Sequence, residues 1–387
     1  MTRTRFLCLA PLVVVLGAIS ASASGRHQHA DSGASILSRH AITTDGHAIF
    51  VAWSPDGKSL LFRDNVLRHA GSLWIASISG HGRRLGIRGS VADAAFARDG
   101  RHILYMPSTP CCTPPILRIG LNGRRPTQVV RPGFHVISTQ VLVNETGSLR
   151  NSVLARGRIV LDRAGKLYVY RPDRRGLRPM AAVHLGPAML RSGLPSAAIS
   201  PSGEWLALIG RHGGLVVRSV RSGRVFRMLL KAPAYGAGVT QVSWSPDSSH
   251  LLYQTGETTG SLREMNLRTG ISRTVMKISL ETVGGFTWSP TGERIAFTIA
   301  PTGVHVGAGN RLLIASANGT SLRELDTGGM YSPLTANTHP GETSPVWSPE
   351  NPSIGYTRLY ERGRSAGNQS LATDAWVARL RMRSSRW

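Results

Sequence analysis

The sequence predicts an all-β fold, a β-propeller of four-stranded antiparallel blades, and three observations support that prediction. A stretch of two apolar runs around a tight turn, first met at residues 50–62, recurs along the chain. A second hairpin follows each copy of the stretch. The copies mostly stand about 40–50 residues apart, which is the period of a propeller blade.

The turn in residues 50–62 (FVAWSPDGKSLLF) has the chemistry of an antiparallel hairpin. Pro55 presets φ, Asp56 can bond its own backbone, and Gly57 supplies the positive φ that closes the turn. Because apolar runs flank this turn, we expect two paired strands. Further copies carry, at the position of Ser54, the residues Ala97, Ser200, Ser245, Ser289 and Ser348.

The interval between Ala97 and Ser200 spans about two periods, so one copy must be hidden inside it. Residues 139–147 align with residues 240–248 and form one candidate, a degenerate copy. Residues 161–166 form another, and the sequence leaves both open.

A second hairpin follows each first one, as an apolar strand, a turn with Gly and a more polar strand. These hairpins begin at Ser72, Pro115, Lys166, Gly214, Ser261 and Arg311, with a truncated copy from Ala375. Two hairpins per unit predict seven blades, with six as the alternative if the third unit is an insertion. The expected blades are residues 47–90, 91–133, 134–191, 196–236, 237–280, 281–340 and 341–387.

The N-terminus predicts export. Arg3 and Arg5 precede an apolar run at residues 6–19, and Ala21-Ser22-Ala23 offers a cleavage site between small residues. We therefore expect a signal peptide at residues 1–23, a periplasmic, cell-envelope or extracellular location, and no transmembrane segment after cleavage. Residues 24–46 form a polar leader before a single propeller domain at 47–387. Since the last blade is short, we expect residues 35–43 to supply its outer strand and close the ring.

The chain is strongly basic, with 46 Lys and Arg against 21 Asp and Glu and a formal charge of +25. The basic residues are spread over strands and turns, which indicates a solvated surface or attraction to anionic polymers or headgroups. The expected export of the chain argues against nucleic acid as its binding partner. Cys111 and Cys112 are adjacent, so a strained disulfide, pairing between chains and two free thiols all stay open.

No motif in the sequence predicts catalysis. Residues 363–367 match G-x-S-x-G, but no His follows Ser365, so we interpret the match as a loop. Metal-binding and phosphate-binding motifs are absent, and His27 and His29 lack neighbouring ligands. We therefore predict no catalytic residue, no metal site and no cofactor.

The copies of W-S-P-D-G followed by apolar residues resemble the TolB-like, WD-like β-propeller repeat, over residues 50–381. The resemblance implies that the stretch before each turn is the inner strand of a blade. It also implies that Trp53, Trp244, Trp288 and Trp347 pack between blades. TolB is a periplasmic scaffold for partner proteins, but its additional α/β domain has no counterpart between this signal peptide and the repeats.

The family geometry and the repeat alignment place a ligand at the mouth of the central channel, where the inner strands begin. The residues expected there are His47, Asp93, His135, Gln241 and Thr343. We expect an exported, monomeric, non-enzymatic scaffold that binds a protein, a peptide or an anionic envelope polymer. The alternative is an exported polysaccharide hydrolase or lyase that uses the channel-mouth residues.

Overall fold

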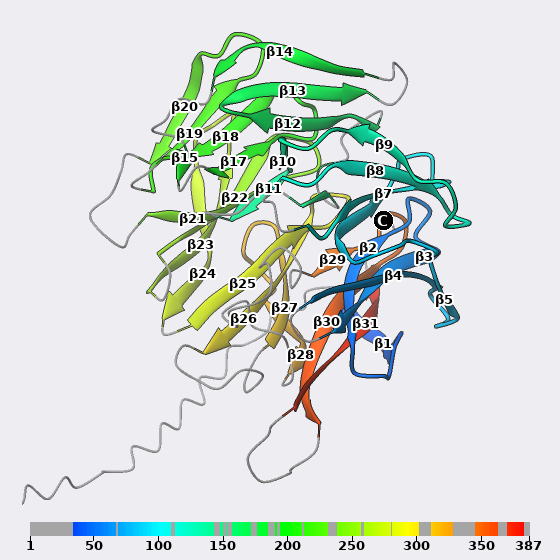
Figure 1. The fold of residues 1–387 in the computed structure, drawn as a ribbon. Coiled ribbons are helices and arrows are strands. Elements are labelled where there is room, and N and C mark those ends of the chain that lie inside the picture. The colour runs from blue at the N-terminus through cyan, green and yellow to red at the C-terminus, as the bar shows by residue number, and fades with distance from the viewer. Residues whose placement is uncertain are drawn as a thin grey trace, which may run out of the picture.

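The computed structural model is a ring of seven antiparallel sheets that follow one another in chain order (Figure 1). It describes residues 34–382, apart from 67–68, 110–112, 143–147, 150–151, 153–156, 172–175, 185–189, 192–193, 211–212, 231–237, 257–258, 280, 302–310, 328–344 and 363–369. The expected signal peptide, the two cysteines, Thr343 and the 363–367 loop lie outside these residues. Within them, no helix is long and apolar enough to cross a membrane.

Blades 1 to 3 each contain four strands, ordered from the channel outward. Blade 1 contains β2 (Ala48–Trp53), β3 (Ser59–Val66), β4 (His69–Ser77) and β5 (Gly82–Arg84). Blade 2 contains β6 (Val91–Phe96), β7 (His102–Pro107), β8 (Ile116–Gly120) and β9 (Thr127–Val130). Blade 3 contains β10 (His135–Ile137), β12 (Ile159–Arg163), β13 (Lys166–Arg171) and β14 (Gly176–His184).

Blades 4 to 6 repeat the pattern. Blade 4 contains β17 (Ala197–Ile199), β18 (Trp205–Ile209), β19 (Leu215–Ser219) and β20 (Val225–Leu230). Blade 5 contains β21 (Val239–Trp244), β22 (His250–Thr255), β23 (Thr259–Asn266) and β24 (Ser272–Ser279). Blade 6 contains β25 (Glu281–Trp288), β26 (Arg294–Pro301), β27 (Arg311–Ser316) and β28 (Arg323–Thr327).

Blade 7 joins the two ends of the described chain. It contains β29 (Val346–Trp347), β30 (Ser353–Arg362) and β31 (Ser370–Met382). Its outermost strand is β1 (Ala34–Ala41), which pairs antiparallel with β31 from Ala34↔Met382 to Ala41↔Trp376. Figure 1 shows the two strands side by side.

The turn chemistry expected from the sequence recurs in the structure. In blade 1, Ser54 N donates to Ser59 O at 2.8 Å and Gly57 N donates to Ser54 O at 2.9 Å. The same pair of bonds closes the turns of blades 2, 4, 5 and 6. Gly57 has φ of 64°, and blade 5 places Ser248 at the equivalent position with the same φ.

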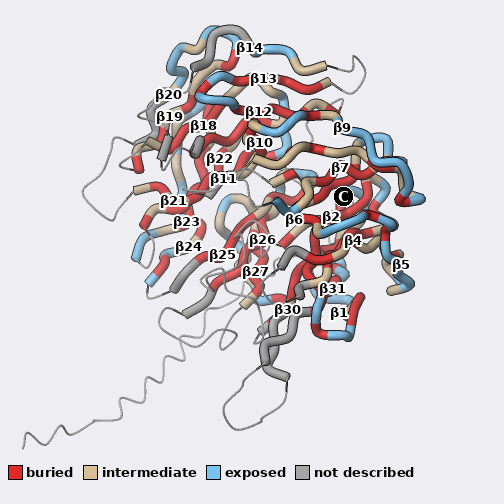
Figure 2. The backbone as a smooth tube through the Cα atoms, viewed as in Figure 1, coloured by how far each residue is buried: buried red, intermediate tan, exposed pale blue. Residues whose placement is uncertain are grey.

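The core lies between the blades. Seven clusters of buried apolar side chains fill the seven interfaces between neighbouring sheets. Figure 2 shows the buried backbone running along the middle of the blades, with exposed segments at outer strands and turns. Since each interface buries side chains from two blades, stability is a property of the ring rather than of one blade.

Indole N–H groups join neighbouring inner strands. Trp244 Nε1 donates to Ala198 O at 2.9 Å, from blade 5 to blade 4. Trp288 Nε1 donates to Ser243 O at 3.3 Å and Trp53 Nε1 to Val346 O at 3.0 Å. Trp347 is buried in the cluster between blades 6 and 7.

Blade 3 departs from the repeat. Residues 161–166 form the hairpin between β12 and β13, which are the second and third strands. Residues 140–142 form β11 (Gln140–Leu142), which adds a fifth strand to the inner edge of blade 5 by pairing with β21. Neither candidate for the hidden copy therefore forms the turn between the first two strands, although the blade itself is present. A further short pair, β15 (Leu190–Arg191) and β16 (Leu194–Pro195), precedes blade 4.

Candidate functional site

A pocket of about 260 Å³ lies between blades 5 and 6, at the face where the inner strands end. Its walls come from the start of β22, from β23 and β24 with the turn between them, and from two turns of blade 6. The lining residues are His250, Glu264, Asn266, Thr269, Ile271, Arg273, Trp288, Gly292, Ala317 and Asn318. Charged, amide and aromatic side chains thus meet in a space of the size that suits a small polar molecule.

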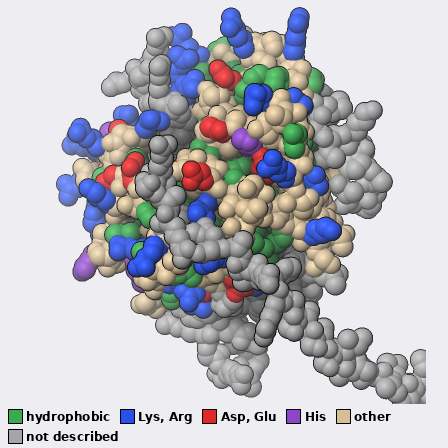
Figure 3. Space-filling model, turned by 180° about the vertical axis from the view of Figure 1, so that it is seen from behind, with side chains coloured by type: hydrophobic (Ala, Val, Ile, Leu, Met, Phe, Trp, Pro, Cys, Tyr) green, Lys and Arg blue, Asp and Glu red, His purple; other side chains and the backbone are tan. Residues whose placement is uncertain are grey.

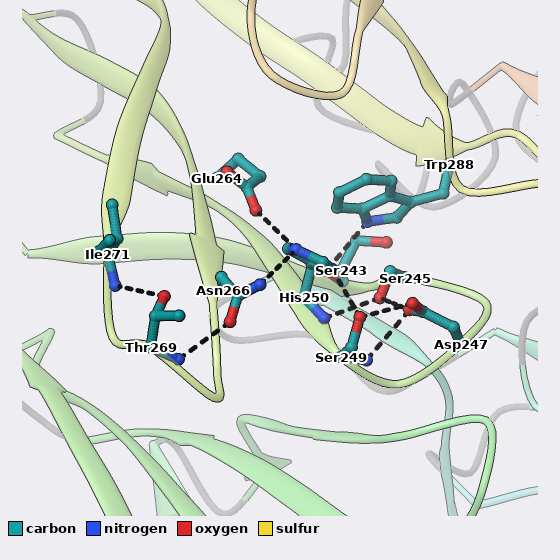
Figure 4. Close-up of polar contacts among 10 residues, drawn as sticks. All are labelled: Ser243, Ser245, Asp247, Ser249, His250, Glu264, Asn266, Thr269, Ile271 and Trp288. Atoms are coloured by element: carbon teal, nitrogen blue, oxygen red, sulfur yellow. Dashed lines mark hydrogen bonds and ion pairs between the residues drawn. The ribbon is translucent and has the colours of Figure 1, made fainter.

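His250 is the centre of the polar network in this pocket (Figure 4). Its Nδ1 lies 2.6 Å from Ser249 Oγ, and Ser249 Oγ donates to Asp247 Oδ2 at 2.5 Å. On the other side of the ring, Nε2 lies 2.9 Å from Asn266 Nδ2 and 3.5 Å from Glu264 Oε1. The imidazole is therefore held at both nitrogens.

The partners of His250 define its neutral tautomer. Ser249 gives its one hydroxyl proton to Asp247, so its oxygen must accept from His250 Nδ1–H. Asn266 presents an NH₂ group, which can only donate, so Nε2 must accept. Both constraints leave the basic lone pair on Nε2, beside Glu264, in the neutral ring.

Glu264 is the buried carboxylate of the pocket, with 8% of its side chain exposed, whereas 32% of the His250 side chain is exposed. Burial raises the pKa of Glu264, and the nearby charges of His250 and Arg273 oppose that rise. Arg273 is exposed at the pocket wall. The site therefore combines a base, a buried acid and an accessible cation.

Trp288 forms the apolar wall. Its ring centroid lies 6.4 Å from that of His250, at an angle of 47°. The indole N–H donates to Ser243 O, so the ring is fixed in place. Trp288 is 7% exposed, so it adds a small, fixed apolar wall to the polar pocket.

The channel-mouth residues expected from the sequence lie elsewhere. Asp93, His135 and Gln241 occupy matching positions near the starts of β6, β10 and β21, opposite Met106, Asp162 and Gln254 on the second strands. His47 is exposed just before β2. These four residues sit at the opposite ends of the inner strands from the pocket, and none lines it.

The structure gives these residues individual surroundings. Asp93 Oδ2 accepts hydrogen bonds from Ser148 Oγ at 2.9 Å and Leu149 N at 2.7 Å. His135 Nδ1 and Gln241 Oε1 are buried without a hydrogen-bond partner. Burial lowers the pKa of His135. Their shared role in ligand binding stays a prediction.

His250, Glu264, Asn266 and Arg273 were not predicted from the sequence. One signal was present, because His250 and His102 occupy the same repeat position, the first residue of the second strand, where Ser59 and Arg294 stand in blades 1 and 6. His102 bonds Asp99 directly, at 2.6 Å, and lies outside the pocket. Within the described ranges, no three His, Cys, Asp or Glu side chains lie close enough together to hold a metal ion.

Comparisons with solved structures show where else this fold occurs. An oligogalacturonate lyase in complex with manganese matches with a TM-score of 0.58 and 13% identity, covering 92% of this chain and 95% of that one. An oligogalacturonate lyase from Vibrio parahaemolyticus matches with a TM-score of 0.57 and 14% identity. The match covers 89% of this chain and 97% of that one. The propeller domain of Cps50 (Swd1) from Myceliophteria thermophila matches with a TM-score of 0.50 and 15% identity. The match covers 89% of this chain and 99% of that one.

Sequence comparisons reach less far. No family model matches the chain. The mouse WD repeat-containing protein 1 is 30% identical over 73 residues, which are 19% of this chain and 12% of the length of that protein.

These findings correct the functional expectation. A non-enzymatic scaffold was the main prediction, but the two matches with the higher TM-scores are lyases, and this favours the alternative of an enzyme acting on polysaccharide. Local motifs could not have located this pocket, because it gathers residues from several strands and turns. Identities this low establish the fold alone. The chain is a seven-bladed β-propeller that shares its fold with two oligogalacturonate lyases and with the Cps50 (Swd1) propeller domain.

Proposed function

We propose that this protein is a polysaccharide lyase, which cleaves an acidic oligosaccharide by β-elimination in the pocket between blades 5 and 6. One observation carries the proposal: His250, Glu264 and Arg273 meet in a pocket with one aromatic wall. The fold likeness to two oligogalacturonate lyases supports the same class of substrate.

The pocket supplies the groups that β-elimination from a uronate requires. Arg273 would pair with the substrate carboxylate and so acidify the proton on the adjacent carbon. His250 Nε2 would take that proton once the substrate displaces Asn266 Nδ2, whose hydrogen bond occupies the Nε2 lone pair in the neutral ring. The C–H electron pair becomes the new C=C bond, the bond from the neighbouring carbon to the glycosidic oxygen breaks, and that oxygen takes a proton.

Glu264 suits the last of these steps. Its raised pKa favours the protonated form more than in an exposed carboxylate, and its Oε1 lies 3.5 Å from His250 Nε2. Hydrolysis ordinarily uses two carboxylates that flank the glycosidic bond, and Glu264 is the single carboxylate among the lining residues.

The charge of the chain is consistent with an anionic substrate. The formal net charge is +25, and Figure 3 shows Lys and Arg side chains outnumbering Asp and Glu over one face of the molecule. A positive surface raises the local concentration of a polyanion and speeds its encounter with the site. Export, inferred from residues 1–23, would bring the enzyme to polysaccharides outside the cytoplasm.

The test is a lyase assay on oligogalacturonates, monitored by the ultraviolet absorbance of the unsaturated product. His250→Gln should lower kcat by roughly 100-fold or more, the usual contribution of a positioned base. His102→Gln is the matched control, since it changes the same repeat position outside the pocket, and it should keep wild-type turnover. No product from the wild-type protein, or equal activity of His250→Gln, would contradict the proposal.

A further inference from the structure

We infer that the pocket continues onto blade 4 as a second carbohydrate subsite, the aromatic shelf, made by Trp205, Phe226 and Arg227. The inference rests on the proposed function, because it assigns the shelf to further units of the same acidic oligosaccharide. It adds a requirement on substrate length that the pocket alone does not impose.

The shelf exposes apolar surface that a propeller has no structural reason to expose. Phe226 is 46% exposed and its neighbour Val225 is 49% exposed, on the outermost strand of blade 4. Edge strands usually carry charge to prevent pairing with other chains, so an exposed aromatic there is a liability unless it binds something. The Trp205 and Phe226 ring centroids lie 4.4 Å apart with the rings tilted by 40°, so the half-buried Trp205 supports the exposed ring of Phe226.

The turn between β23 and β24 lies between the shelf and the pocket and contacts both. Arg227 Nη2 donates to Arg268 O at 3.2 Å, across the boundary between blades 4 and 5. Arg268 opens the turn between β23 and β24, and the same turn supplies Thr269 and Ile271 to the pocket wall. Ile271 is 55% exposed, so apolar surface extends from the pocket over this turn toward the shelf.

Gly270 keeps the turn and the shelf in contact. Its φ is 78°, and a side chain there would collide with Arg227 Nη1. The guanidinium therefore packs on the bare backbone of Gly270. This places the Arg227 side chain between the aromatic pair and the turn that walls the pocket.

The chemistry of the shelf matches a sugar acid. The exposed Phe226 ring, supported by Trp205, offers an apolar surface for the C–H face of a sugar ring. The Arg227 guanidinium carbon lies 5.9 Å from the Phe226 centroid, close enough to pair with the carboxylate of a ring stacked there. Pocket and shelf thus each contain an arginine and an aromatic ring: Arg273 and Trp288 line the pocket, and Arg227 lies over Phe226 in the shelf. One chain with a carboxylate on each unit fits both.

The test compares substrate lengths in two separate measurements, turnover and equilibrium affinity, with galacturonate oligomers from the dimer to the pentamer. Wild-type affinity should rise with length. Phe226→Ala should lower affinity for the longer oligomers by roughly 5–20-fold and leave the shortest one unchanged, since stacking contributes on the order of 1–2 kcal/mol. Phe226→Tyr should restore the gain, and Leu37→Ala, a matched exposed apolar residue (53% exposed) on β1, should leave it intact.

The two measurements separate the shelf from the proposed reaction. A length-dependent gain in affinity that Phe226→Ala removes supports the shelf, whether or not the oligomers are cleaved. An identical length dependence in wild type and Phe226→Ala overturns the shelf, even if turnover depends on His250. Absence of binding at every length overturns the shelf, while turnover is judged separately from product formation.

Discussion

Two buried carboxylates show how much the immediate partners of one residue matter. Asp326 accepts from Tyr356 OH at 2.9 Å and from Arg39 Nη1 at 2.5 Å, so its charge is compensated. Asp162 is 1% exposed, and its Oδ1 has no hydrogen-bond partner. Burial raises the pKa of Asp162 to about 6, and a bond from the Gly165 N–H only partly opposes that rise.

Asp162→Asn is therefore expected to stabilise the protein at neutral pH. A carboxyl whose pKa rises on folding stabilises the folded state only while it is protonated. Stability should fall as pH rises from 3.8 to about 6, by about 3 kcal/mol at most. The Asp162→Asn variant should lose this dependence of stability on pH. At pH 7.5 its free energy of unfolding should exceed that of the wild type by about 1–3 kcal/mol.

Urea unfolding across that pH range measures the effect. Asp326→Ala is the opposing variant, since it leaves Tyr356 OH without its acceptor, and it should destabilise by about 2–3 kcal/mol. An unchanged pH slope in Asp162→Asn would show that Asp162 is not the group responsible.

At the scale of single residues, the sequence indicated positions but not partners. The repeat alignment located His250 within its blade, yet nothing in the sequence shows that Glu264, Asn266 and Arg273 turn toward it. Glu264 is two strands away from the inner strand, and its neighbour depends on sheet register. The register of the strands, and the face of the sheet on which each side chain lies, are set only when the strands pair.

At the scale of elements, the indole hydrogen bonds join inner strands that share no β-ladder. Trp244→Phe removes the donor to Ala198 O while keeping an aromatic ring in the cluster between blades 4 and 5. We expect a loss of about 1 kcal/mol from the hydrogen bond, plus a contribution from the smaller ring.

Trp74→Phe is the matched control, because Trp74 Nε1 is buried without a hydrogen-bond partner. Its melting temperature should change less than that of Trp244→Phe. Equal losses in the two variants would mean that ring volume, and not the hydrogen bond, decides the cost.

The strands that the sequence located best are those next to a local turn. The S-P-D-G chemistry acts within a few residues, so the hairpins of blades 1, 2, 4, 5 and 6 could be predicted. In contrast, β11 lies between β10 and β12 of blade 3 in the sequence but pairs with β21 in blade 5. Its partner lies about a hundred residues away, and no local pattern encodes that pairing.

At the scale of the whole molecule, β1 links the two ends of the described ring. Arg39 reaches Asp326 of blade 6, and His40 Nε2 lies 3.0 Å from Ile78 O of blade 1. Thr43 Oγ1 donates to Asp374 Oδ1 at 2.8 Å. The strand therefore contacts both neighbours of blade 7 as well as blade 7 itself.

Deleting residues 24–45 should lower the melting temperature by roughly 5 °C or more, since the deletion removes a paired strand and its contacts to three blades. Calorimetry of the truncated and full mature chains measures it, and Leu37→Ala, which keeps the strand, should show little change. An unchanged melting temperature would mean that the ring is stable without β1.

The architecture was largely readable from the sequence, because seven similar units leave a periodic pattern. The proposed site was not readable, because the pocket between blades 5 and 6 exists only after two blades have packed together. The repeat alignment placed the ligand at the start of the inner strands, whereas the proposed site lies at their other end.

The pairing of β1 with β31 also constrains when the protein can finish folding. Thr43 and Asp374, which hydrogen-bond at this seam, are 331 residues apart in the sequence. A ribosome must therefore synthesise nearly the whole chain before its first described strand meets its partner. Until then the early blades carry an unpaired apolar face, so we expect slow final closure and a dependence on chaperones that hold the growing chain.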